Sequence, residues 1–162
     1  MVRVVIILLL VALQAAFGAP DYLLGTEHYW LRALSYSFFH ANWWHLAVNC
    51  IAVWSIFSPS RKWLKPLLWA LLIATLVYPL SFRPVIGFSN VLYAVIGLRT
   101  PSLKSQWWKQ TPVIVFLVVT VALVFVPQFS ATTHIAAFLL GALFASIGRY
   151  SKDIFNDFRR YL

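Results

Sequence analysis

The sequence predicts an all-α membrane protein with six transmembrane helices, a short fourth helix and both termini on the inner side. Of its 162 residues, 62% are hydrophobic and only 10% are charged, far from the balance of a soluble globular domain. Its 13 Lys and Arg residues lie between apolar runs and do not form the stripe that binds nucleic acid. We expect one transmembrane domain over residues 1–162, surrounded by the lipid bilayer, with no appended soluble domain and no nucleic-acid partner.

Six apolar segments are the expected spans. Several are shorter than the ~20 residues that cross ~30 Å of hydrocarbon, so these helices tilt, thin the bilayer or begin below its surface. The longest linker, residues 18–42, is expected on the outer side. In chain order the segments cover residues 2–17, 43–57, 63–82, 89–98, 112–126 and 133–148.

The first segment has a second interpretation. Arg3, the apolar run after it and the small residues of AAFGAP also resemble a secretory signal peptide with its cleavage region. Retention and removal of residues 1–19 both leave residues 20–42 on the outer side, so the predicted orientation is the same.

Basic residues determine that orientation. Six spans place the N-terminus, the linkers 58–62 and 99–111 and the C-terminal tail on one side. Only two of the 13 basic residues, Arg32 and Arg83, lie opposite, which predicts N-in, C-in by the positive-inside rule. The other eleven are Arg3, Arg61, Lys62, Lys65, Arg99, Lys104, Lys109, Arg149, Lys152, Arg159 and Arg160.

Four strongly polar residues lie within the predicted spans, where each costs on the order of a few kcal/mol. Counting ~1.5 Å of helical rise per residue from the next inner cation places all four in the outer half of the bilayer. The four residues come from three different helices and lie at overlapping depths, as a shared cavity opening outward would require. Depth alone does not make their side chains face one another. The four are His45, Asn49, Ser89 and His134.

Helical spacing indicates how these residues could meet. Two rows of small and polar residues would let the fourth and sixth spans approach closely. If Gly97 of one span packs on Gly141 of the other, Ser89 comes within reach of His134. The rows are Ser89, Tyr93 and Gly97 in one span, and His134, Ala137, Gly141 and Ala145 in the other.

Each residue also has an ordinary structural interpretation. A lone serine in a membrane helix usually bonds back to its own i−4 carbonyl, and a lone histidine is often structural. The convergence of four such groups favours a function. His28 and His40, in or beside the outer loop, are expected to be solvated or interfacial, and Cys50 to be a packed thiol.

Missing carboxylates exclude several chemistries. No Asp or Glu occurs between residues 28 and 152, which excludes a paired-aspartate protease and a zinc protease of the HExxH type. Carboxylate-based ion transport is disfavoured, and serine chemistry is left with a Ser-His dyad. His40 and His45 would diverge by roughly 140° around a helix unless a turn intervenes. We expect no metal and no cofactor.

Three motifs resemble those of the rhomboid intramembrane serine proteases. HANWWHLAVN contains His40, His45 and Asn49 in the spacing of that family's second-helix motif. GFSNVLYAVIG is similar to its GxSG nucleophile turn, and THIAAFLLGALFA resembles its sixth-helix segment. Arg32 stands where the family commonly has the arginine of a Trp-Arg pair. The resemblance covers residues 1 to about 150 as a minimal six-helix core.

The resemblance implies a role for each matching residue. Ser89 would attack the scissile carbonyl, and His134 would accept its proton and return it to the leaving amine. The backbone N–H of Ser89 and the side chains of His45 and Asn49 would form the oxyanion hole. Supporting residues would be Gly87 in the nucleophile turn, Tyr93 against the His134 ring, His40 and Arg32 in the first outer loop, and Gly141 in the sixth helix.

The chain departs from the family pattern at three positions. Asn90 replaces the second glycine of the nucleophile motif, Ala137 replaces the glycine three residues after the histidine, and Leu31 replaces the tryptophan before Arg32. Asn90 and Ala137 add atoms near the expected contact of the fourth and sixth helices.

The resemblance implies a multi-pass serine endopeptidase of a bacterial inner membrane that cleaves transmembrane-anchored proteins near the outer face. Two alternatives stay open. One is a catalytically inactive rhomboid-like protein that binds or escorts membrane-spanning clients, and the other is a small channel or transporter that uses buried histidines. The fifth span and residues 127–132 are the expected moving gate for the substrate.

Overall fold

The computed structural model describes residues 1–20, 29–57, 64–81, 85–99, 118 and 130–160, and every regular element in this part is a helix. The expected all-helical fold is confirmed. The predicted fifth span, residues 112–126, lies outside the described residues except for position 118, as do gate residues 127–129. The helices are α1 (Val2–Phe17), α2 (Tyr29–Ser35), α3 (Trp43–Ile56), α4 (Leu64–Val77), α5 (Ser89–Arg99) and α7 (Ala131–Arg160).

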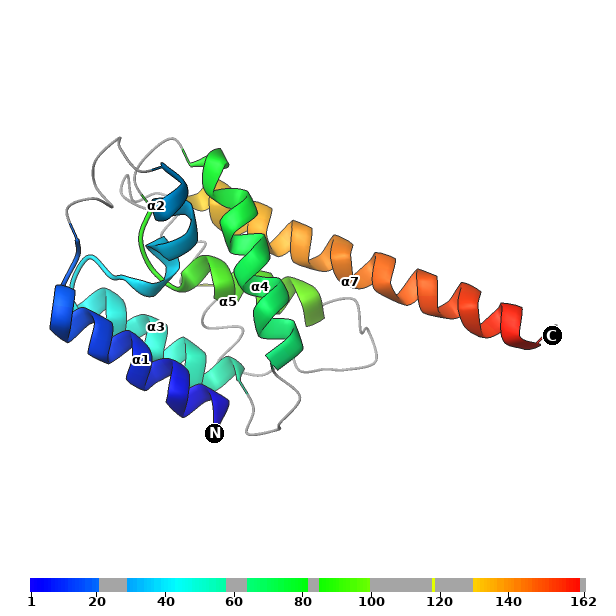
Figure 1. The fold of residues 1–162 in the computed structure, drawn as a ribbon, viewed down its shortest axis with the longest axis horizontal. Helices are drawn as coiled ribbons and strands as arrows, with labels where there is room; N and C mark the ends of the chain where they lie inside the picture. Colours follow the sequence, from blue (N-terminus) through cyan, green and yellow to red (C-terminus); the bar gives the residue numbers. More distant parts are fainter. Residues whose placement is uncertain (21–28, 58–63, 82–84, 100–117, 119–129, 161–162) are drawn as a thin grey trace.

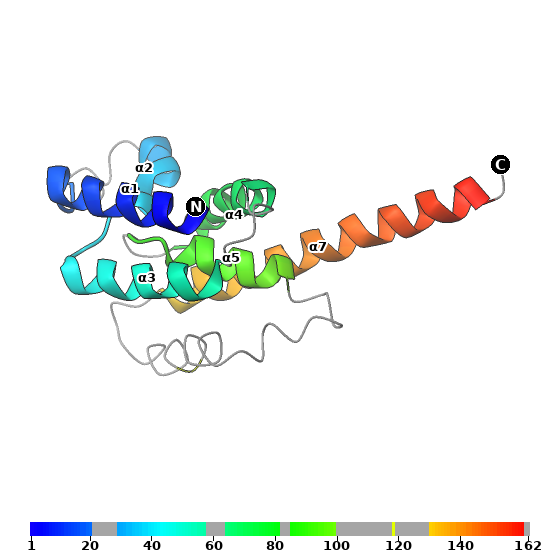
Figure 2. The same cartoon turned by 90° about the horizontal axis from the view of Figure 1, so that it is seen from below.

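The helices pack around α5. In Figure 1, α1 and α3 lie side by side, α4 crosses near α5, and α7 runs past the other helices to the C-terminus. The view turned by 90° separates α1, α2 and α4 from a second layer of α3, α5 and the first half of α7 (Figure 2). Contacts of α5 with α3, α4 and α7 make it the central element of the described part.

Local sequence features explain where α1 ends and where α3 begins. α1 ends before Gly18, whose φ of 61° lies in the left-handed region that favours glycine at a helix C-terminus. α3 begins after Asn42, whose side-chain oxygen accepts the backbone N–H of His45 at 2.8 Å. This N-cap satisfies one of the amides that a helix leaves unpaired at its start.

Proline ends the third predicted segment earlier than residue 82. α4 stops at Val77 and passes into the 3₁₀ helix η3 (Tyr78–Leu80), which contains Pro79. Because proline has no backbone N–H and restricts the residue before it, the α-helix cannot continue through this position.

The structure corrects the sequence prediction at two further places. The linker 18–42, which the sequence predicts on the outer side, contains α2 and the 3₁₀ helix η2 (Tyr36–Phe38). The last helix does not end at residue 148, because α7 continues to Arg160. A single glycine costs a helix only about 1 kcal/mol, and no proline follows Gly148 to stop it.

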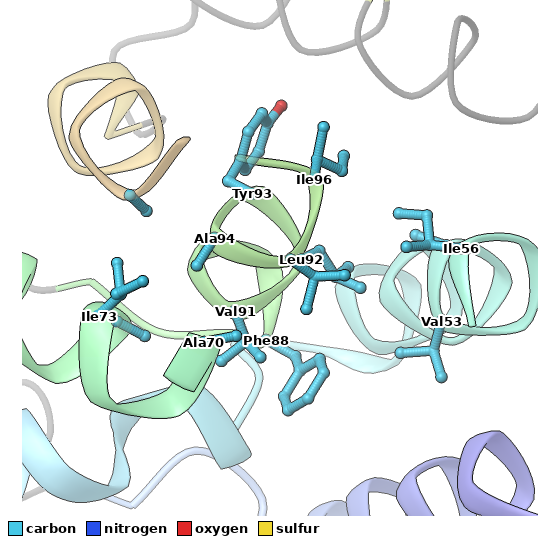
Figure 3. Packing of buried hydrophobic residues seen from close by; sticks show 14 of the residues in the cluster. Val53, Ile56, Ala70, Ile73, Phe88, Val91, Leu92, Tyr93, Ala94 and Ile96 are labelled. Carbon is cyan, nitrogen blue, oxygen red and sulfur yellow. The ribbon is translucent and has the colours of Figure 1, made fainter. Parts of the chain in front are cut away.

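α5 is buried on all sides. Residues 90–97 are all buried, and Figure 3 shows Val91, Leu92 and Ala94 pointing from α5 toward different neighbours. Ala70 and Ile73 of α4 lie on one side of it, and Val53 and Ile56 of α3 lie on another. A helix whose apolar residues face every direction needs such a surrounding, and this packing fixes the position of Ser89, the partly buried first residue of α5.

Large apolar side chains cover the outside of the bundle. Hydrocarbon solvates such a surface, whereas a soluble monomer rarely exposes large contiguous apolar patches. Within the described residues, Ala131–Gly148 is the only window both long and apolar enough to cross a membrane, with a mean hydropathy of 1.6, and three apolar helices are shorter. Outward-facing residues include Val5 and Leu8 of α1, Trp44 and Ile51 of α3, Leu68 and Leu72 of α4, and Ile135, Leu139 and Leu143 of α7.

Candidate active site

Ser89 and His134 meet between α5 and α7. Ser89 is the first residue of α5, and its Oγ lies 2.7 Å from Nε2 of His134, in the first turn of α7. The imidazole is 3% exposed, and the Tyr93 ring packs against it with a centroid distance of 4.8 Å and an interplanar angle of 55°. A hydroxyl within hydrogen-bond reach of an oriented histidine is the arrangement of an activated nucleophile.

Two glycines allow the helices to approach closely enough for this contact. A Cβ on Gly97 would overlap the carbonyl oxygen of Phe138 in α7. A Cβ on Gly141 would lie 2.5 Å from the carbonyl oxygen of Ala94 in α5. The side chain of Ala137 is completely buried, so the extra methyl group at this position is accommodated between the helices. The small-residue rows therefore place the backbones of α5 and α7 in direct contact.

Gly87 provides the turn before Ser89. Its φ of 122° is a conformation that other residues rarely adopt. A Cβ here would also lie 2.6 Å from Cε1 and 2.8 Å from Nε2 of His45. The His45 ring thus lies directly against the turn that carries Ser89, and both the conformation and the available space require glycine.

The prediction that His40 is solvated or interfacial is wrong. Its side chain is fully buried, and its Nε2 accepts the backbone N–H of Phe88 at 3.4 Å. His40 precedes α3 and is separated from it by a turn, so its ring packs edge-on against that of His45 with centroids 5.2 Å apart. His28 lies outside the described residues.

Burial of His40 predicts an acid-sensitive fold. Desolvation, with a smaller contribution from the nearby His45, lowers the pKa of His40 to about 3. In the unfolded chain a histidine titrates near pH 6.5, so between these values the unfolded state binds one more proton and the free energy of unfolding falls as the pH falls. We expect a loss of up to about 2 kcal/mol between pH 7 and pH 5.

The variant His40→Gln isolates this effect, because glutamine keeps an acceptor for the Phe88 amide but does not titrate. Thermal unfolding in detergent at pH 7 and pH 5 measures it. The wild type should lose more stability than the variant, and equal losses in the two proteins would contradict the assignment to His40.

Asn49 and Arg32 are both buried, at 2% and 8% exposure. Asn49 lies one turn after His45, and its Nδ2 donates to the His45 carbonyl oxygen at 2.9 Å. An amide nitrogen carries two hydrogens, so one N–H is left for another acceptor. Arg32 lies on α2, and the resemblance implies a bracing role for it.

The sequence did not reveal the importance of Tyr36. This residue of η2 is fully buried, and its hydroxyl oxygen accepts Nδ2 of Asn90 at 2.8 Å. Asn90 was expected to add atoms near the contact of α5 with α7, but its amide points to η2. In the sequence, position 90 stood out only because asparagine replaces the glycine of the family motif. No local pattern indicated that Tyr36 would contact it.

Comparison with known families identifies the chain. The family model of the Rhomboid domain matches residues 27–151, which include every residue of the candidate site. No curated protein matches the chain. Since the match extends over most of the 162 residues and the three motifs lie within it, the protein is a member of the rhomboid family, whose members are integral membrane proteins.

Proposed function

We propose that this protein is an intramembrane serine protease that cleaves membrane-anchored proteins near the outer face with a Ser-His dyad. One observation carries the proposal, the 2.7 Å contact between Oγ of the partly buried Ser89 and Nε2 of the buried His134. The family match is consistent with this activity and with related proteins that lack it.

Catalysis proceeds in two steps, acylation of Ser89 and hydrolysis of the acyl-enzyme, and His134 transfers the proton in both. Ser89 Oγ attacks the scissile carbonyl carbon while His134 Nε2 takes the hydroxyl proton. The carbon–nitrogen bond then breaks, the proton passes to the leaving amine, and an acyl-enzyme remains on Ser89. Water attacks this ester, His134 takes the proton of the water, and its return to Oγ releases the carboxylic acid product.

The oxyanion formed in each step needs donors that are already in place. The backbone N–H of Ser89 belongs to the first turn of α5, where amides have no intrahelical partner. His45, against the Gly87 turn, and the remaining N–H of Asn49 are the other donors in this proposal. Each such donor contributes about 3 kcal/mol to transition-state stabilisation in other serine proteases.

The proposed topology follows from the charges. With both termini inside, the excess of basic residues in the inner linkers obeys the positive-inside rule of a bacterial inner membrane. The dyad then lies toward the outer side, and its substrate is a transmembrane protein. The cut requires a locally extended segment, because a helix holds its carbonyls in hydrogen bonds to its own amides.

A fluorophosphonate probe tests the dyad on the purified protein. Serine attack on phosphorus needs the same base as attack on a carbonyl, so we expect labelling at Ser89 in the wild type and none in His134→Ala. Mass spectrometry of the peptide that contains Ser89 measures the adduct. Absence of labelling in the wild type, with client binding unchanged in Ser89→Ala, would refute the protease and favour the binding protein.

A further inference from the structure

Tyr36 bonds to the chain on both sides of Ser89. Its carbonyl oxygen accepts the backbone N–H of Gly87 at 3.0 Å, two residues before the serine. Its hydroxyl oxygen accepts Nδ2 of Asn90 at 2.8 Å, one residue after it. One residue of the outer stretch therefore holds both ends of the turn that carries the nucleophile.

The hydroxyl of Tyr36 is itself anchored to α4. It donates to the carbonyl oxygen of Ala74 at 2.8 Å, and burial raises the pKa of Tyr36 to about 12, so the proton stays on the oxygen. A phenol has one hydrogen, and because Ala74 takes it, the contact with Asn90 needs an N–H donor. An asparagine amide meets this requirement, and a carboxylate of the same shape does not.

His40 adds a third attachment four residues along the chain. Its Nε2 accepts the backbone N–H of Phe88, the residue directly before Ser89. Residues 36–40 thus hold positions 87, 88 and 90, and the side chain of Ser89 is left to bond His134. Tyr36, His40 and Asn90 have no measurable exposure, so water does not compete for these bonds.

We propose that Tyr36 and Asn90 form a positioning pair that fixes the turn carrying Ser89 and thereby sets the rate at which Ser89 reacts. This inference rests on the proposed function. Neither residue touches the reacting atoms, and both act through the placement of Ser89 Oγ relative to His134 Nε2. The asparagine in place of the motif's second glycine is, in this chain, the means by which the outer stretch is attached to the nucleophile turn.

Three variants test the pair. Tyr36→Phe removes the hydroxyl, Asn90→Ala removes the amide, and Asn90→Asp keeps the shape without an N–H donor. We expect each to slow fluorophosphonate labelling of Ser89 and kcat by about tenfold, less than the roughly 100-fold that a 1 Å misplacement can cost, with less than about a twofold change in KM. The double variant Tyr36→Phe/Asn90→Ala should also be about tenfold slower, because both changes break one bond.

Tyr78→Phe is the matched control. The ring of Tyr78 packs against that of Tyr36 with centroids 4.9 Å apart, and the same atom is lost, but no bond to the nucleophile turn is removed. Its labelling rate should equal that of the wild type. All rates are measured below the thermal transition of each variant, so that loss of folded protein does not enter.

The outcomes separate this inference from the proposed function. Labelling of the wild type with equal rates in the three variants would overturn the positioning pair alone. So would variants that lose thermal stability but label at the wild-type rate, or a double variant slowed by about a hundredfold, as independent effects require. A wild type that is not labelled at Ser89 would overturn both.

Discussion

The variant Ser89→Ala is expected to cleave a membrane-spanning reporter about 10⁶-fold more slowly than the wild type, the size of loss seen when a serine protease loses its nucleophile. Methyl replaces hydroxymethyl at the start of α5, so His134 loses the hydroxyl that the proposed dyad activates, while the helices keep their packing. Binding of the reporter should not change. Turnover and reporter affinity in proteoliposomes measure both quantities.

Ser146→Ala is the control for this prediction. Ser146 lies on α7, and its hydroxyl donates to the carbonyl oxygen of Ala142 in its own helix at 2.8 Å, the ordinary arrangement of a serine in a membrane helix. Its loss should leave turnover within about twofold of the wild type, as for a surface substitution away from the site. Equal turnover in Ser89→Ala and the wild type would show that Ser89 is not the nucleophile.

The second large effect is expected from Gly141→Ala. The new Cβ would lie 2.5 Å from the carbonyl oxygen of Ala94 and 2.9 Å from the backbone nitrogen of Leu98, so the backbones of α5 and α7 must separate. Overpacking of this kind costs about 1–3 kcal/mol of stability. Because the same contact holds Ser89 against His134, turnover should fall by roughly 100-fold or more.

Gly148→Ala makes the same substitution two turns further along α7. A Cβ there meets nothing within 4 Å, and alanine is the better helix former, so stability should be unchanged or higher by up to about 1 kcal/mol. Thermal unfolding and reporter cleavage of the two variants are compared directly. Similar behaviour of both proteins would contradict the close contact of α5 with α7.

Much of the described fold could be predicted from hydrophobic runs and from the residues at their ends. The observed α1, α3 and α5 differ from the predicted segments by at most one residue at either end. Such runs are informative because a bilayer requires continuous apolar helices. Short helices have no such signal. The helices α2 and η2 contain too few residues to show a hydrophobic periodicity, and helices of this length depend on tertiary packing.

The same distinction applies to the site. Spacing within a helix indicated that Gly97 and Gly141 could bring Ser89 to His134, because residues on one helical face share a direction regardless of the loops. The burial of His40 and the bond between Tyr36 and Asn90 depend on residues 36–40 packing against the start of α5. No local pattern encodes a contact between residues 54 positions apart in the chain.

The most direct test of the Ser-His dyad is to map the cut. Purified protein is reconstituted into liposomes with a single-span reporter, and mass spectrometry identifies both fragments. We predict one cut within or beside the membrane segment, toward its outer end, with the wild type and none with Ser89→Ala or His134→Ala. An intact reporter with the wild type, or the same fragments with either variant, would contradict proteolysis by Ser89 and His134.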